Sequence, residues 1–161
     1  MSAIDFTYAS ASDGETRILG RKLGNLLAAG DVVALTGELG SGKTCFAKGL
    51  ARGLGVPADV VVNSPSFALL NEYDDGRVTF YHLDAYRLER RDDFLGAGLD
   101  EVFHQGGVVA LEWGDRWPEI LPDWTVTAAF DMVDDTSRNI RFSARHPRSE
   151  NILIQLKQQL G

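Results

Sequence analysis

The chain has 161 residues, of which 44% are hydrophobic and 24% are charged, a length and composition typical of one globular domain over residues 1–161. It has no apolar run long enough to cross a bilayer and no secretory signal at its start, so we expect a cytoplasmic protein without a membrane segment. Its 16 basic and 23 acidic residues give a formal net charge of −7, which argues against a stand-alone activity on DNA or tRNA, because phosphate binding favours a basic protein.

The first predicted elements are a helix, a buried strand, a glycine-rich loop and a second helix. Ser12 or Asp13 can cap a helix over residues 15–29, which ends at a glycine. A strand is predicted over 32–36, because Val-Val-Ala-Leu is apolar on both faces. The glycine-rich loop follows, and residues 44–53 have the pattern of a helix. The apolar positions expected to pack in the first helix are Ile18, Leu19, Leu23, Leu26 and Leu27.

A β-hairpin is predicted in the middle of the chain. Residues 60–62 indicate a short strand that leads into a polar loop over 63–66. The runs 67–73 and 77–83 then flank Asp-Asp-Gly, a strong turn signal between two strands.

The remaining elements alternate between helix and strand. Two glycines break residues 94–104 into short helical pieces, and 108–111 is a second fully apolar strand. Residues 126–131 and 139–144 predict strands joined by a polar turn, and 151–160 predicts a terminal helix. Interleaved helices and strands indicate a three-layer α/β fold with a mixed, mainly parallel sheet. The residues of the last helix available for packing are Ile152, Ile154, Leu156 and Leu160.

Residues 37–44 match the phosphate-binding pattern G-x-x-x-x-G-K-[ST]. Its glycines allow a tight turn in which backbone N–H groups point at an anion, and the following helix adds its partial positive charge. Lys43 is expected to contact the β- and γ-phosphates, and the Thr44 hydroxyl to bind Mg²⁺. The chain lacks the Asn-Lys-x-Asp element of guanine-specific proteins, which favours ATP. The predicted phosphate loop consists of Gly37, Glu38, Leu39, Gly40, Ser41, Gly42, Lys43 and Thr44.

Two acids, Asp84 and Glu112, follow apolar runs that read as strands. A P-loop NTPase needs a carboxylate at such a position to orient Mg²⁺ and its waters. Our hypothesis is that Asp84 binds the metal and Glu112 polarises the attacking water or a metal-bound water, although the sequence leaves open which acid is the direct ligand. We interpret His82 as a hydrogen-bonded spacer. Trp113 fits two positions, in the nucleotide pocket or at the edge of the core.

Two further features have a structural interpretation. We expect Cys45 to pack as a small buried hydrophobe. Because it is the single cysteine of the chain, an intrachain disulfide and a zinc site of several thiolates are excluded. The cluster Arg87, Arg90 and Arg91 is best explained as a solvated charged turn.

Taken together, the chain resembles the TsaE (YjeE) family, the bacterial ATPase of tRNA threonylcarbamoyladenosine biosynthesis. The resemblance extends from the first helix to the strand that contains Arg138, and its combination of motifs is more specific than the phosphate loop alone. The matching pieces are Gly-Glu-Leu-Gly-Ser-Gly-Lys-Thr at 37–44, Ser-Pro-Ser-Phe at 64–67, His-Leu-Asp-Ala-Tyr-Arg-Leu at 82–88, Gly-Leu-Asp-Glu-Val-Phe at 98–103 and Leu-Glu-Trp at 111–113.

The resemblance implies a P-loop NTPase fold, ATP hydrolysis and association with the TsaB and TsaD proteins, whose complex transfers a threonylcarbamoyl group to tRNA. It implies that the ATPase acts on tRNA only indirectly, which agrees with the acidic net charge. By position, Thr44 and Glu112 match metal-site residues and Asp84 matches the acid of a His-x-Asp motif. Ser66 matches a hydroxyl of a switch-like loop, and Ser12 and Arg138 match positions near the nucleotide.

The chain departs from the family at two positions, where Glu38 replaces the usual aspartate and Ser66 the usual threonine. Ser66 keeps the hydroxyl but loses a methyl group, so the loop is expected to be less firmly seated. Two other functions are compatible with this fold, a small-molecule kinase that uses ATP and a module that binds nucleotide without hydrolysing it.

Overall fold

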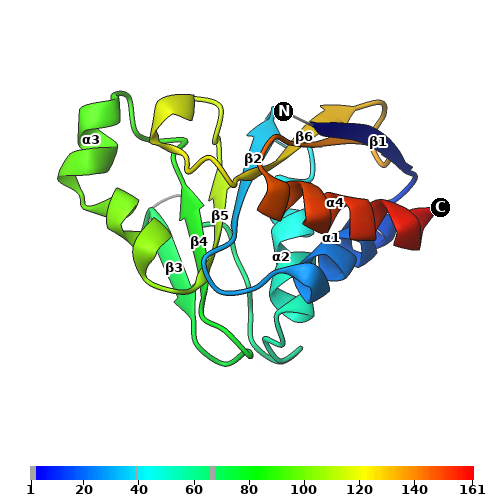
Figure 1. Cartoon of the computed structure of the whole chain (residues 1–161), viewed down its shortest axis with the longest axis horizontal. Helices are drawn as coiled ribbons and strands as arrows, with labels where there is room; N and C mark the ends of the chain where they lie inside the picture. Colours follow the sequence, from blue (N-terminus) through cyan, green and yellow to red (C-terminus); the bar gives the residue numbers. More distant parts are fainter. Residues whose placement is uncertain (1–2, 39, 66–67) are drawn as a thin grey trace.

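The computed structural model describes residues 3–38, 40–65 and 68–161, and in this part of the chain seven strands form one mixed sheet (Figure 1). Their order is β1-β7-β6-β2-β5-β4-β3. The central strands β6, β2, β5 and β4 pair in parallel, whereas β7, β1 and β3 are attached by antiparallel pairing. The bounds are β1 Ile4–Ser10, β2 Val32–Gly37, β3 Leu70–Tyr73, β4 Phe80–Asp84, β5 Val108–Glu112, β6 Val126–Met132 and β7 Arg138–Ala144.

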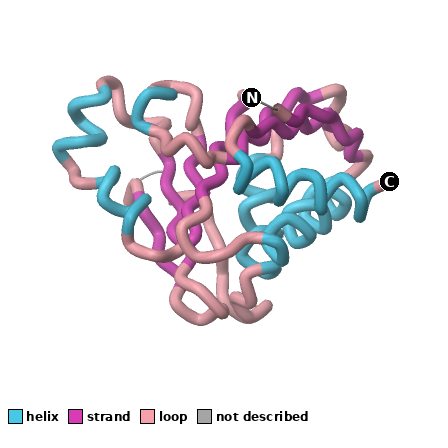
Figure 2. The backbone as a smooth tube through the Cα atoms, in the orientation of Figure 1, coloured by secondary structure: helices cyan, strands magenta, loops and turns pink. Residues whose placement is uncertain are grey.

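Helices cover the sheet on both faces, and together with the sheet they make three layers. Figures 1 and 2 show α1, α2 and α4 gathered on one side of the molecule and α3 apart from them, near β4 and β5. None of the described helices is both long and apolar enough to cross a membrane. The predicted three-layer α/β fold with a mixed sheet is therefore confirmed. The helices are α1 Asp13–Leu26, α2 Lys43–Gly53, α3 Arg91–Gly96 and α4 Pro147–Leu160, with short 3₁₀ turns η1 Leu99–His104 and η2 Pro118–Ile120.

The buried strands send alternate side chains into two separate cores, as the pleat requires. In β2, Val33 and Leu35 pack with α1, α2 and α4, whereas Val32 packs on the opposite face with Phe94 of α3 and Phe103 of η1. Both faces of the central strands are covered, which explains why these strands are continuously apolar in sequence.

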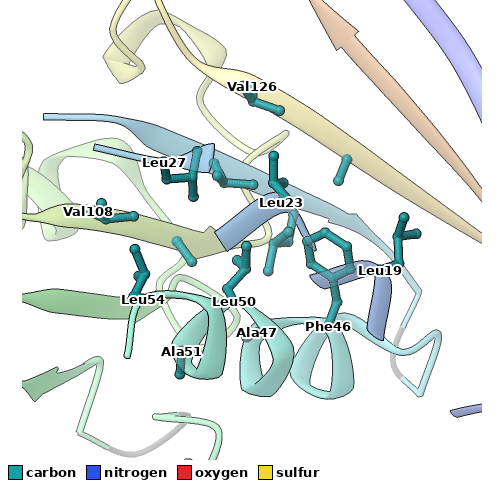
Figure 3. Packing of buried hydrophobic residues seen from close by; sticks show 14 of the residues in the cluster. Leu19, Leu23, Leu27, Phe46, Ala47, Leu50, Ala51, Leu54, Val108 and Val126 are labelled. Atoms are coloured by element: carbon teal, nitrogen blue, oxygen red, sulfur yellow. The ribbon is translucent and has the colours of Figure 1, made fainter. Parts of the chain in front are cut away.

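Helices α1 and α2 approach each other closely because glycines face glycines across their contact. A Cβ atom added to Gly49 of α2 would lie 2.1 Å from the carbonyl oxygen of Arg17, and one added to Gly20 of α1 would lie 2.3 Å from that of Phe46. Around this contact, Leu19 and Leu23 pack with Leu50 and other residues of α2 over the sheet (Figure 3). The packing fixes α2, whose first residue is Lys43.

Most predicted elements are present, with shifted ends. The first helix runs over Asp13–Leu26 rather than 15–29, and Ser12 caps it by accepting a hydrogen bond from the Glu15 N–H. The hairpin is formed by β3 and β4, both shorter than predicted, and residue 67 of its first predicted strand lies outside the described residues.

Two expectations about these elements were wrong, and one strand was not predicted. Residues 60–62 are irregular rather than a strand; Val62 is buried in the core without ladder pairing, and Val61 is 70% exposed. Ile18 and Ile154 point outward, 57% and 46% exposed, because they lie off the apolar stripe of their helices. Strand β1 was missed, although its alternation of Ile4, Phe6 and Tyr8 is a strand signal of period two.

Candidate nucleotide and metal site

The glycine-rich loop connects the end of β2 to the start of α2. Gly37 and Gly42 have φ angles of 135° and 105°, values that other residues rarely adopt. A Cβ atom at Gly37 would lie 2.6 Å from the Phe130 carbonyl oxygen of the neighbouring strand, so the loop leaves the sheet through a space only glycine fits. The strand–loop–helix geometry expected of a phosphate loop is thus present.

A cavity of about 480 Å³ lies over this loop. It is lined by loop residues on one side and by the ends of β4, β5 and β7 on another. Of the predicted site residues, Gly40, Gly42, Lys43, Thr44, Asp84, Glu112 and Arg138 line it.

The other predicted site residues that the structure describes are not among those that line the cavity. Ser41 is a buried residue of the loop, and Ser12 uses its side-chain oxygen to cap α1. Gly37 and Glu38 belong to the loop but are not among the residues that line the cavity. Their contact with nucleotide stays a prediction, as does that of Leu39 and Ser66, which lie outside the described residues.

The Lys43 ammonium group is buried in the cavity wall and is held from two sides. It donates a hydrogen bond to the Gly37 carbonyl oxygen and lies 3.4 Å from the centroid of the Trp113 ring, a cation–π contact. Burial lowers the pKa of Lys43, and the charges of Glu112, Asp84 and Asp115 oppose this shift. Trp113 therefore lines the cavity, where it contacts the lysine, and it also packs at the edge of the second core, so both of its predicted positions are present.

The two candidate acids end adjacent parallel strands, with Asp84 opposite Glu112 in register. The Thr44 hydroxyl lies 3.4 and 3.3 Å from the two carboxylate oxygens of Glu112. Asp84 instead accepts hydrogen bonds from the Tyr86 N–H at 2.9 Å and the Ser64 hydroxyl at 3.1 Å. Thr44 is the expected metal-binding hydroxyl, and this contact brings Glu112 beside it. Which of the two acids binds the metal directly stays a prediction.

His82 is wholly buried beside Glu112, with its Nε2 atom 2.6 Å from Glu112 Oε2. Its hydrogen bond agrees with the interpretation of a spacer. No group of three or more His, Cys, Asp or Glu side chains within the described residues could hold a metal ion. Mg²⁺ does not require such a cage, since it keeps several waters and binds through one or two carboxylates and substrate phosphates.

Arg138 braces the loop from β7. Its Nε donates to the Ser41 carbonyl oxygen at 2.7 Å, and its Nη2 lies 3.4 Å from Asp13 Oδ1 at the start of α1. Arg138 is only 6% exposed, and its Nη1, like the Ser41 hydroxyl, is buried without a hydrogen-bond partner among the described residues. The unpaired nitrogen of Arg138, the glycine loop and the buried ammonium line one cavity and fit a polyanion, with Thr44 and Glu112 available to Mg²⁺.

Sequence reasoning did not place Asp13, Ser64 and Tyr86 in the cavity wall. Tyr86 belongs to the His-x-Asp-x-Tyr motif, which was a usable signal, and its ring lies 5.1 Å from that of Trp113. Asp13 lines the cavity itself and forms an ion pair with Arg138, a long-range contact without a local sequence signal.

Cys45 is half-buried rather than buried, because it lies at the cavity wall and its thiol donates to the Asp13 carbonyl oxygen. Burial raises the pKa of this thiol. Of the predicted arginine turn, Arg90 and Arg91 are exposed and form ion pairs with Asp93 and Glu119, as expected of a solvated turn. Arg87 instead lines the cavity, which that interpretation missed.

The three-layer fold and the loop between β2 and α2 define a P-loop nucleotide-binding protein. The family model described as threonylcarbamoyl adenosine biosynthesis protein TsaE matches residues 10–140. The chain belongs to the TsaE family.

Individual relatives agree. A tRNA threonylcarbamoyladenosine biosynthesis protein TsaE from Treponema pallidum is 44% identical over 131 residues, which cover 81% of this chain and 95% of the relative. The protein of the same name from Bacillus subtilis is 39% identical over 149 residues, 92% of each chain. The crystal structure of Bacillus subtilis YdiB has a TM-score of 0.83 and 32% identity, and the alignment covers 100% of this chain and 99% of that one.

Proposed function

We propose that this protein binds and hydrolyses ATP·Mg²⁺ in the cytoplasm, and that its nucleotide cycle supports turnover of a TsaB–TsaD threonylcarbamoyl transferase complex acting on tRNA. The observation that carries the proposal is the convergence of Lys43, Thr44 and Glu112 on one cavity above the glycine loop. The names of its relatives supply the pathway, tRNA threonylcarbamoyladenosine biosynthesis.

In this mechanism, the loop amides and the Lys43 ammonium bind the phosphate tail and stabilise the negative charge that grows during hydrolysis. The Thr44 hydroxyl and Glu112 hold Mg²⁺, which neutralises phosphate charge when bound. A carboxylate of the pair Glu112 and Asp84 orients the attacking water, and Arg138 keeps the loop in shape through the Ser41 carbonyl group. Trp113 covers the Lys43 ammonium and limits its access to bulk water.

Hydrolysis is expected to be slow in the isolated chain, because switch elements often become ordered only with their partner. The test is release of inorganic phosphate from ATP by the protein alone and with TsaB and TsaD, using Lys43→Ala as the inactive variant. Lys157→Ala is a matched control, since Lys157 is exposed on α4 outside the cavity. We expect phosphate release that increases with the partners and is lost only in Lys43→Ala. Equal rates with and without the partners would contradict the coupling, and ADP formation without free phosphate on adding a metabolite would favour a kinase.

A further inference from the structure

The imidazole of His82 has no role in the mechanism so far, although it touches one of the key carboxylates. His82 lies within β4 and is 0% exposed, and the Phe80 ring stacks 5.9 Å from it. On the neighbouring strand β5, its register partner Ala110 comes two residues before Glu112. The pleat therefore places His82 and Glu112 on the same face of the sheet.

Packing alone does not account for a histidine at this position. Its Nε2 is bonded to Glu112, but its Nδ1 is buried without a hydrogen-bond partner among the described residues. A half-paired buried imidazole is less favourable than an apolar side chain of similar shape. The contact with Glu112 is therefore the property that distinguishes histidine from an apolar residue here.

The hydrogen bond fixes one oxygen of Glu112 and leaves the other available. A carboxylate only accepts hydrogen bonds, so the shared hydrogen lies on His82 Nε2. This bond engages Oε2 at 2.6 Å, whereas the Thr44 hydroxyl lies at nearly equal distances from both oxygens. With Oε2 held, rotation of the carboxylate is restricted and Oε1 keeps a lone pair for a further ligand.

We propose that His82 is a positioning residue that orients the Glu112 carboxylate, so that Oε1 faces the metal or its water beside Thr44. The inference rests on the proposed function, because it assigns the carboxylate to Mg²⁺. Loss of a hydrogen bond that orients a metal ligand typically costs about 10- to 100-fold in metal affinity or activity.

Three substitutions separate positioning from packing. The amide nitrogen of His82→Gln reaches the place of Nε2, whereas that of His82→Asn reaches only the place of Nδ1. His82→Phe keeps the ring and its stacking but removes the donor. The readout is nucleotide affinity as a function of Mg²⁺ concentration, with unfolding by urea as a check of the fold.

In His82→Phe and His82→Asn, the Mg²⁺ concentration that gives half of the maximal effect on nucleotide affinity should rise about 10- to 100-fold. In His82→Gln this concentration should lie much closer to that of the wild type. Affinity without Mg²⁺ should stay within about twofold, because the loop and Lys43 are intact. In a Glu112→Gln background, His82→Phe should add little, because the two residues act as a unit. Equal Mg²⁺ requirements in the Gln and Asn variants, or an additive double variant, would overturn the proposal.

A second readout needs neither nucleotide nor metal. Nitrogen NMR of the histidine-labelled protein should show His82 with its hydrogen on Nε2, and Glu112→Gln should shift this signal. If the nucleotide affinity of the wild-type protein did not depend on Mg²⁺, the proposed function would be wrong. The NMR measurement would still test the His82–Glu112 contact, because it requires neither nucleotide nor metal. An Nε2 signal unchanged by Glu112→Gln would exclude the contact.

Discussion

The glycine contact between α1 and α2 gives a prediction whose magnitude can be worked from distances. In Gly49→Ala the new methyl group would lie 2.1 Å from the Arg17 carbonyl oxygen and 2.9 Å from the Arg21 nitrogen. Both are backbone atoms of α1, so a side-chain rotation cannot relieve the clash and the helices must separate. Overpacking of this kind costs about 1–3 kcal/mol, which exceeds the gain of about 1 kcal/mol from replacing glycine in a helix when the helices cannot adjust.

Gly96→Ala in α3 is the matched control, because a Cβ atom there would meet nothing within 4 Å. It should be neutral or stabilising by up to about 1 kcal/mol. For a domain of this size, 1 kcal/mol corresponds to about 2–4 °C in Tm. Urea and thermal unfolding should therefore show a lower stability for Gly49→Ala and no loss for Gly96→Ala. If Gly49→Ala were as stable as Gly96→Ala, the close helix contact and its role in fixing α2 would be wrong.

Three other predictions concern the site. Arg138→Met removes the donor that bonds the Ser41 carbonyl oxygen. The loss of this charged hydrogen bond should lower the free energy of unfolding by about 1.5–3 kcal/mol and weaken ATP binding. Unchanged ATP affinity in calorimetry would contradict the bracing role of Arg138. Glu112→Gln should still bind ATP but hydrolyse it about 100-fold more slowly, as expected for loss of a charged catalytic group. If Asp84→Asn lost more of the Mg²⁺ dependence than Glu112→Gln, Asp84 rather than Glu112 would be the metal ligand. The pKa of Lys43 is lowered in the folded protein, so between that pKa and the ordinary value of 10.5 the unfolded chain binds more protons than the folded chain. The contribution of Lys43 to the free energy of unfolding therefore rises with pH in that window. Lys43→Met should lack this rise in urea unfolding, and identical pH profiles of the wild type and Lys43→Met would refute the prediction.

The sequence was sufficient for those features that depend on local patterns. The apolar strands β2 and β5, the hairpin and the phosphate loop follow from residue type and short spacing, and all were predicted. The acids Asp84 and Glu112 were found because they end strands, and a strand end in a parallel sheet is where ligands bind.

Features that depend on tertiary contacts were beyond local patterns. The order of strands, which places Arg138 of β7 behind the loop and Asp13 beside it, brings together residues far apart in the chain. The contact of Thr44 with Glu112 rather than Asp84 joins α2 to β5, and the spacing of either acid from the loop does not reveal it. Residues 60–62 were mistaken for a strand because a short apolar run looks the same whether or not a neighbour is available for pairing.

A crystal structure with Mg²⁺ and a non-hydrolysable ATP analogue tests the central claim most directly. It should show the terminal phosphates within hydrogen-bond distance of the amides of the loop between β2 and α2, with the ion bound by Thr44 and a Glu112 oxygen. Phosphates bound away from that loop, or an ion that contacts neither side chain, would contradict the account.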